Sequence, residues 1–146
     1  MNKLFMHIGT YKTGSTALQQ WLRINSNYLK SNDILYIPKS YNFLRKTING
    51  DKNCNYIELK DVRQSLFKTS RKENNKTLVI SSEHLSGDPK YGYIDSLAIA
   101  RTMKEITSGL NLQIFIIVYL RRQDNFFESL YTEMIHQGGI MILNIF

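Results

Sequence analysis

A lysine, two glycines and several hydroxyl side chains lie close together near the start of the chain, in the segment Gly9-Thr10-Tyr11-Lys12-Thr13-Gly14-Ser15-Thr16. An apolar run precedes this segment, and a pattern typical of an amphipathic helix follows it. A strand, a glycine-bearing loop and a helix N-terminus in this order can form an anion site, because backbone N–H groups converge there and the helix dipole adds positive potential. The loop is therefore predicted to bind a phosphate.

The position of the lysine distinguishes two kinds of phosphate loop. The spacing of Gly9 and Gly14 is close to that of the triphosphate loop G-x4-G-K-[ST]. In that motif a lysine follows the second glycine, whereas this chain has Ser15 there and Lys12 inside the loop. A P-loop kinase or NTPase therefore remains an alternative, although the chain lacks the lysine that the motif requires. In this alternative, Glu83 is the carboxylate that could bind magnesium.

The rest of the chain alternates strand-like and helix-like segments. Strands are predicted near residues 3–8, 34–37, 77–82 and 113–120, and helices over about 15–29, 56–72, 93–108 and 125–137, with a loop over 39–55. Apolar strands without polar alternation are typical of a parallel sheet that is covered on both faces. The predicted fold is a three-layer, P-loop-like α/β domain over residues 1–137 with about four parallel strands between helices.

Further polar residues follow the predicted strands. Glu83 and His84 come after the third strand, and Arg121 comes after the fourth. The carboxyl ends of parallel strands form the usual ligand-binding edge of such a sheet. Glu83 and His84 are candidate proton acceptors. Arg121 and Ser129 could hold a second phosphate, since a guanidinium fork and a hydroxyl bind phosphate oxygens well, although Arg121-Arg122 taken alone also fits a solvated basic pair.

The composition narrows the class of partner. A formal charge of +7 and a pI near 9.5 favour an anionic partner, but the lysines are scattered, so nucleic acid is not predicted. With one cysteine, Cys54, and no paired histidine motif, neither a disulfide framework nor a metal site is expected. The sequence shows no targeting segment and no membrane span, and we expect a cytoplasmic protein.

Three segments together resemble a known family. HIGTYKTGSTALQQWL, LVISSEHLSG and IIVYLRRQDNFFESLY look, in order and rough spacing, like the motif blocks of sulfotransferases that use 3′-phosphoadenosine 5′-phosphosulfate (PAPS). The nearest likeness is to the bacterial and Golgi-type carbohydrate sulfotransferases. The resemblance implies that PAPS is the co-substrate, that the 3′,5′-bisphosphate PAP is the product, that a hydroxyl of a carbohydrate accepts the sulfuryl group, and that no metal takes part.

The resemblance also implies roles for single residues. Arg121 and Ser129 would hold the 3′-phosphate, and Lys12 would neutralise charge on the bridging oxygen as the donor bond breaks. Glu83 is the first choice as general base and His84 the second. The 5′-phosphosulfate would be held by the first loop, through Thr10, Tyr11, Lys12, Thr13, Gly14, Ser15 and Thr16.

The chain departs from that family in length. Carbohydrate sulfotransferases of this type are usually much longer, and the resemblance covers only their amino-terminal half. The segment 138–146 is apolar and uncharged, as an aberrant end from a frameshift, a premature stop or a gene split would be. We expect strand 113–120 to lose its outer neighbour, which would expose a sheet edge and favour self-association. An active sulfotransferase and a truncated, inactive fragment that keeps at most nucleotide binding are the two leading hypotheses.

Overall fold

The computed structural model describes residues 1–38, 55–72, 76–89, 92–136 and 138. The described residues form an α/β fold around a four-stranded, all-parallel sheet with the strand order β2-β3-β1-β4. This confirms the predicted fold class and the parallel sheet. The strands are β1 (Asn2–His7), β2 (Ile34–Tyr36), β3 (Thr77–Ser81) and β4 (Leu112–Ile117).

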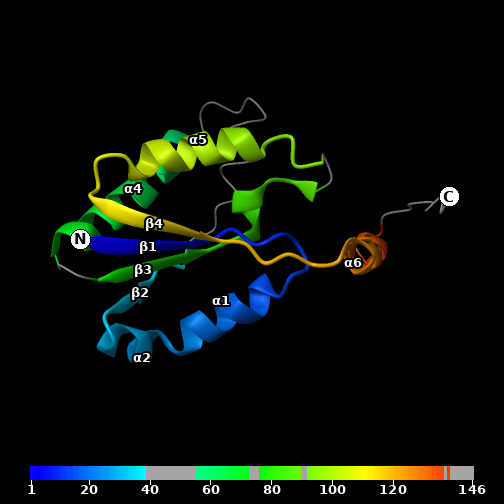
Figure 1. Cartoon of the computed structure of the whole chain (residues 1–146), viewed down its shortest axis with the longest axis horizontal. Coiled ribbons are helices and arrows are strands. Elements are labelled where there is room, and N and C mark those ends of the chain that lie inside the picture. The colour runs from blue at the N-terminus through cyan, green and yellow to red at the C-terminus, as the bar shows by residue number, and fades with distance from the viewer. Residues whose placement is uncertain (39–54, 73–75, 90–91, 137, 139–146) are drawn as a thin grey trace.

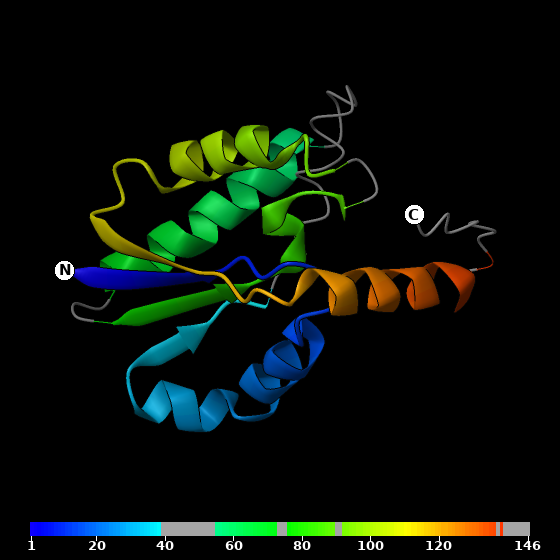
Figure 2. The same cartoon turned by 45° about the vertical axis from the view of Figure 1, so that its right-hand side comes forward.

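Helices cover both faces of the sheet (Figure 1). On one face lie α1 (Ser15–Ile24) and α2 (Ser26–Ser31), and on the other lie α4 (Asn55–Lys72) and α5 (Ser96–Thr107). The last helix, α6 (Gln123–His136), extends beyond the carboxyl ends of the strands rather than lying over a face (Figure 2). None of the helices in the described ranges is long and apolar enough to cross a membrane.

The hydrophobic core lies between the sheet and the pair α4 and α5. Leu4, Leu78 and Ile80 of the sheet are fully buried, and Leu66 of α4 and Ile99 of α5 pack against them. Leu4 pairs with Leu78 in register, so these two side chains point to the same face. This layer fixes the positions of β1 and β3, whose carboxyl ends carry the first loop and Glu83.

The predicted helix over 15–29 is two helices. α1 ends at Asn25, whose backbone N–H and side-chain amide both donate to the carbonyl oxygen of Trp21, at 3.0 and 2.9 Å. Such a local side-chain bond competes with continuation of the helix. α2 then starts at Ser26 and leads the chain back to β2. The prediction for residues 39–54 and for the tail beyond residue 138 lies outside the described residues.

The predicted inward face of the helix over 93–108 is wrong in its first turn. The helical period of the sequence predicts an apolar side formed by Ile94, Leu97, Ala98 and Ile106, yet Ile94 and Leu97 are 84% and 61% exposed. The buried carboxylate of Asp95 accepts a hydrogen bond from the backbone N–H of Asp88 at 2.9 Å, and this contact turns the helix so that position 95 faces inward. The buried side chains of α5 are Ile99, Met103, Ile106 and Thr107, so the prediction is confirmed for Ile106.

The most apolar strand of the sequence is an edge strand. β4 stands at the end of the strand order, and within the described part of the chain it pairs only with β1. Ile114 and Ile116 are 39% and 61% exposed. On the opposite face, Phe115 stacks on Phe5 with ring centroids 4.8 Å apart. β4 therefore buries one face in part and leaves apolar side chains uncovered on the other.

Candidate functional site

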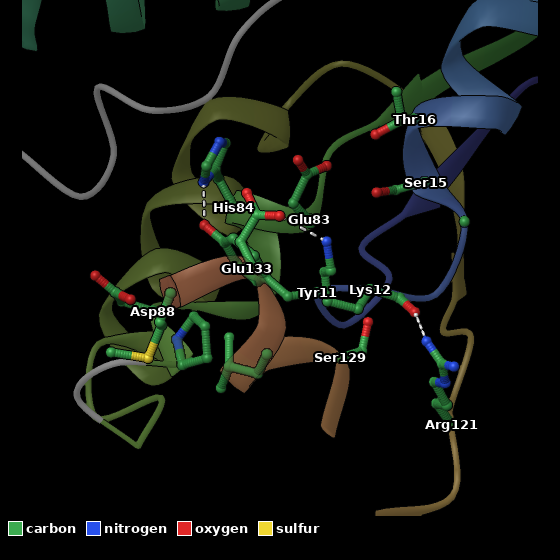
Figure 3. A pocket seen from close by; sticks show the side chains of 14 residues that line it. Tyr11, Lys12, Ser15, Thr16, Glu83, His84, Asp88, Arg121, Ser129 and Glu133 are labelled. Atoms are coloured by element: carbon green, nitrogen blue, oxygen red, sulfur yellow. Dashed lines mark hydrogen bonds and ion pairs between the residues drawn. The ribbon is translucent and has the colours of Figure 1, made fainter. Parts of the chain in front are cut away.

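A cavity of about 580 Å³ opens where β1 and β3 end, beside the middle and second half of α6 (Figure 3). The loop after β1, the short 3-10 turn Glu83–Ser86 and α6 each contribute to its wall. The structure thus brings together polar groups that are more than 100 positions apart in the sequence, such as Lys12 and Arg121. The lining residues that the sequence predicted are Tyr11, Lys12, Gly14, Ser15, Thr16, Glu83, His84, Arg121 and Ser129.

The first loop has an unusual backbone. Both Lys12 and Gly14 have left-handed conformations, with φ of 61° and 85°. Glycine adopts this conformation freely, whereas for a lysine it costs about 1–2 kcal/mol. Gly14 is also the N-cap of α1 and supplies no side-chain hydrogen bond to the first turn. The N–H groups of that turn are therefore arranged to receive an anion.

The Lys12 side chain is held by an acidic residue of α6. Its Nζ atom lies 2.9 Å from Oε2 of Glu133, and the two side chains are 32% and 42% exposed (Figure 3). Glu133 was not singled out from the sequence. It lies four residues after Ser129, so one face of a helix carries both residues into the cavity. That spacing was the available signal.

Arg121 is attached to the first loop by its guanidinium. Nη1 donates to the carbonyl oxygen of Lys12 at 3.0 Å (Figure 3). The other guanidinium nitrogens have donors to spare, and Ser129 lines the same cavity. Two polar clusters therefore face one space. One is formed by Lys12, Ser15 and Thr16, and the other by Arg121 and Ser129.

Glu83 is a carboxylate with several hydrogen-bond donors around it. Nε2 of Gln19 donates to its Oε2 at 3.0 Å, and the Ser15 hydroxyl is a further donor. Burial by itself would raise the pKa of Glu83, but the backbone N–H of Glu83, the Gln19 and Ser15 donors and the nearby His84 together bring it below its ordinary value. Glu83 is therefore ionised at neutral pH and can accept a proton.

His84 is oriented by an aromatic partner. The hydroxyl of Tyr11 lies 2.6 Å from Nδ1 of His84, and the two rings meet edge to face. With the phenol as donor, Nδ1 accepts and the ring proton lies on Nε2. The backbone N–H of His84 also donates to the Ser82 hydroxyl at 3.3 Å. These contacts fix the imidazole at the wall of the cavity.

A buried histidine supports the loop from below. Nδ1 of His7 lies 2.8 Å from the Ser81 hydroxyl, which ties the end of β1 to the end of β3. Burial lowers the pKa of His7, and the charge of Glu83 opposes this only in part, so the ring is neutral. A Cβ at Gly9 would lie 2.9 Å from the His7 ring, so only glycine fits there. His7 therefore has a structural role, because it joins the ends of the two strands that carry the site.

Two of the predicted ligand-binding residues contribute to the loop itself. The Thr10 hydroxyl donates to the carbonyl oxygen of Tyr119 at 3.2 Å, and the Thr13 hydroxyl donates to the carbonyl oxygen of Thr10 at 2.6 Å. Neither lines the 580 Å³ cavity, although Thr13 borders a shallower hollow beside Arg121. The Thr10 hydroxyl thus holds the loop against the segment that follows β4, and the Thr13 hydroxyl forms a bond within the loop.

The arrangement suits binding of a polyanion. Two cationic side chains, several hydroxyls and a helix N-terminus converge, and three acidic residues, Glu83, Asp88 and Glu133, line the same cavity. Across the described ranges, no group of three or more His, Cys, Asp or Glu side chains could hold a metal ion. Comparison of the chain with protein-family models, with curated proteins and with solved structures found no match.

Proposed function

We propose that this chain is a PAPS-dependent sulfotransferase that transfers a sulfuryl group to a hydroxyl, and that the hydroxyl belongs to a carbohydrate. The observation that carries the proposal is that one cavity is lined both by Lys12, Ser15 and Thr16 and by Arg121 and Ser129. Lys12, Ser15 and Thr16 suit a 5′-phosphosulfate, and Arg121 with Ser129 suits a 3′-phosphate. The P-loop-like first loop and the motif order support the same conclusion.

The proposed reaction is an in-line displacement at sulfur. The acceptor oxygen forms a bond to sulfur while the bond from sulfur to the bridging oxygen breaks, and PAP leaves with that oxygen. Lys12 neutralises the charge that develops on the bridging oxygen. The acceptor proton passes to Glu83, which is ionised, whereas His84 carries its ring proton on Nε2 when Tyr11 donates to Nδ1.

Two alternatives make different predictions about binding. A P-loop kinase or NTPase would bind ATP with magnesium, yet Ser15 occupies the place of its lysine. A fragment that binds the donor without transferring the group is favoured by one observation, the uncovered apolar side chains of β4. Binding and transfer therefore have to be measured separately.

The test is a pair of titrations followed by a transfer assay. Isothermal titration should show that PAP binds at least tenfold more tightly than ATP with magnesium, because two clusters match two separate phosphates. Lys12→Ala should lower the transfer rate about a hundredfold or more. Lys30→Ala, at an exposed position on α2, is the control. Equal affinity for ATP and PAP would overturn the donor assignment. PAP binding without any transfer would support the alternative of an inactive fragment that binds the donor.

A further inference from the structure

A second cavity, of about 150 Å³, shares a wall with the first. Both cavities are lined by Glu83 and His84, which are the lining residues that they share within the described ranges. The second cavity lies among α1, the end of β2 and the end of β3. Its other lining residues are Gln19, Arg23, Tyr36, Pro38, Ser81 and Ser82.

We propose that this second cavity binds the acceptor, as a single sugar ring that carries a carboxylate or sulfate substituent. The proposal rests on the proposed function, because it places the donor in the first cavity. Glu83 then stands between the two ligands, where a base must stand to take a proton from the acceptor hydroxyl during attack on the donor. Among the residues that the structure describes, no other carboxylate lines both spaces.

The size of the second cavity limits the group that enters it. A protein cavity of about 150 Å³ is large enough for one six-membered ring. The volume therefore admits no more than one sugar ring and is too small for a disaccharide or a nucleoside. A longer glycan would place one unit in the cavity and leave its neighbours outside.

The lining chemistry favours a polar ring with a negative charge. Arg23 supplies a guanidinium, and within the described part of the chain no acidic side chain pairs with it. The Ser81 hydroxyl contacts His7, and the Ser82 hydroxyl accepts from a backbone N–H. Arg23 and Tyr36 are further polar groups in the wall of the cavity. Guanidinium binds carboxylate and sulfate oxygens through paired hydrogen bonds.

Tyr36 and Gln19 complete the recognition of a sugar. Tyr36 is half-buried and offers both an aromatic face and a hydroxyl. Burial raises the pKa of this phenol, which keeps the hydroxyl protonated. The positive charge of Arg23 lowers the pKa of the same phenol and offsets part of that rise. The Gln19 amide donates its N–H to Glu83, so its carbonyl oxygen is available to a sugar hydroxyl. Gln19 therefore connects the acceptor to the base.

The test compares three hexoses as ligands of the whole chain. Glucuronate, glucose 6-sulfate and glucose are titrated and followed by ligand-observed NMR. The wild-type chain should bind at least one acidic sugar about tenfold more tightly than glucose, as expected for one charge-assisted contact. Arg23→Gln should abolish that preference, and Lys30→Gln, a neutralised cation outside the cavity, should keep it.

Tyr36→Phe provides a second, milder change that keeps the ring and removes the hydroxyl. It should weaken binding of all three sugars severalfold without changing the preference for an acidic one. Equal binding of glucose and the acidic sugars, an unchanged preference in Arg23→Gln, or no sugar binding would each overturn the proposal. A circular dichroism spectrum of each variant confirms that the chain is folded.

The failure of this inference is distinguishable from failure of the proposed function. If PAP binds but no acidic sugar does, the acceptor site is wrong and the donor site stands. If an acidic sugar binds in a way that depends on Arg23 while PAP does not bind, the second cavity stands as a sugar site and the sulfotransferase proposal fails.

Discussion

Oε2 of Glu133 lies 2.9 Å from Nζ of Lys12, so the ammonium group of the first loop is already paired with an acidic side chain of α6. An incoming anion has to compete with this carboxylate for the same ammonium group. Both side chains are partly exposed, and ion pairs of this kind contribute about 0.2–1 kcal/mol. The contact is therefore weak enough for a ligand to displace.

Removing the charge of Glu133 should strengthen anion binding. Glu133→Gln keeps the shape of the side chain and should tighten binding of pyrophosphate and of PAP about two- to fivefold, since a contact worth up to about 1 kcal/mol no longer competes. Isothermal titration at low and high salt measures this. Glu128→Gln, on an exposed part of the same helix, is the matched control. Weaker binding by Glu133→Gln would mean that Glu133 helps to hold the ligand.

Arg121 should affect donor binding more than turnover. Arg121→Ala removes both the hydrogen bond to the Lys12 carbonyl oxygen and the proposed contact with the 3′-phosphate. We expect PAP affinity to fall at least tenfold, as charged hydrogen bonds to phosphate contribute about 1.5–3 kcal/mol. Arg122→Ala is the control, because Arg122 pairs with Asp124 on the surface. An unchanged PAP affinity in Arg121→Ala would remove Arg121 from the donor site.

The hydrogen bonds around Glu83 should give a pH dependence of stability. Because folding lowers the pKa of Glu83 below its ordinary value of 4.5, these bonds stabilise the folded chain above that pH, and the stabilisation is lost as the pH falls through the folded pKa. The free energy of unfolding of the wild type should exceed that of Glu83→Gln most at neutral pH, with the gap closing in acid. Urea titrations at several pH values measure this gap, and a constant gap would contradict the assignment.

The uncovered face of β4 should promote self-association. Ile116 is 61% exposed on an edge strand, and unpaired edges with apolar side chains add to other chains. Sedimentation velocity at tens of micromolar should show dimers or larger species for the wild type, and Ile116→Lys should shift the chain toward monomer. Ile94→Lys, an exposed isoleucine far from β4 in the sequence, should leave the distribution unchanged. A wild-type monomer at these concentrations would refute the expectation.

Much of the fold could be predicted from the sequence because its signals are local. Apolar runs located all four strands, and the helical period located α4 and α6. The break at Asn25 and the phase of α5 could not be predicted, because each depends on a particular hydrogen bond. The Asp95 carboxylate, which sets the phase, meets a backbone N–H at Asp88 that no periodicity reveals.

The site was predictable where residues follow strand ends, since parallel topology brings those ends together. Lys12, Glu83 and Arg121 were found in this way, and they line one cavity. Glu133 was missed because helix α6 carries many polar residues, and only the direction in which the helix leaves β4 decides which of them turns inward. The second cavity was missed because it depends on where the short β2 ends relative to α1.

The left-handed backbone conformation of Lys12 also predicts which substitution position 12 would accept during evolution. Glycine at position 12 would relieve about 1 kcal/mol of strain, so drift constrained by folding alone would replace the lysine. The ion pair with Glu133 offsets part of this strain, and the proposed anion site at the loop is a further reason to retain the charge. Among descendants of this chain, loss of the lysine with an intact core would therefore mark lineages in which the proposed anion site is no longer used.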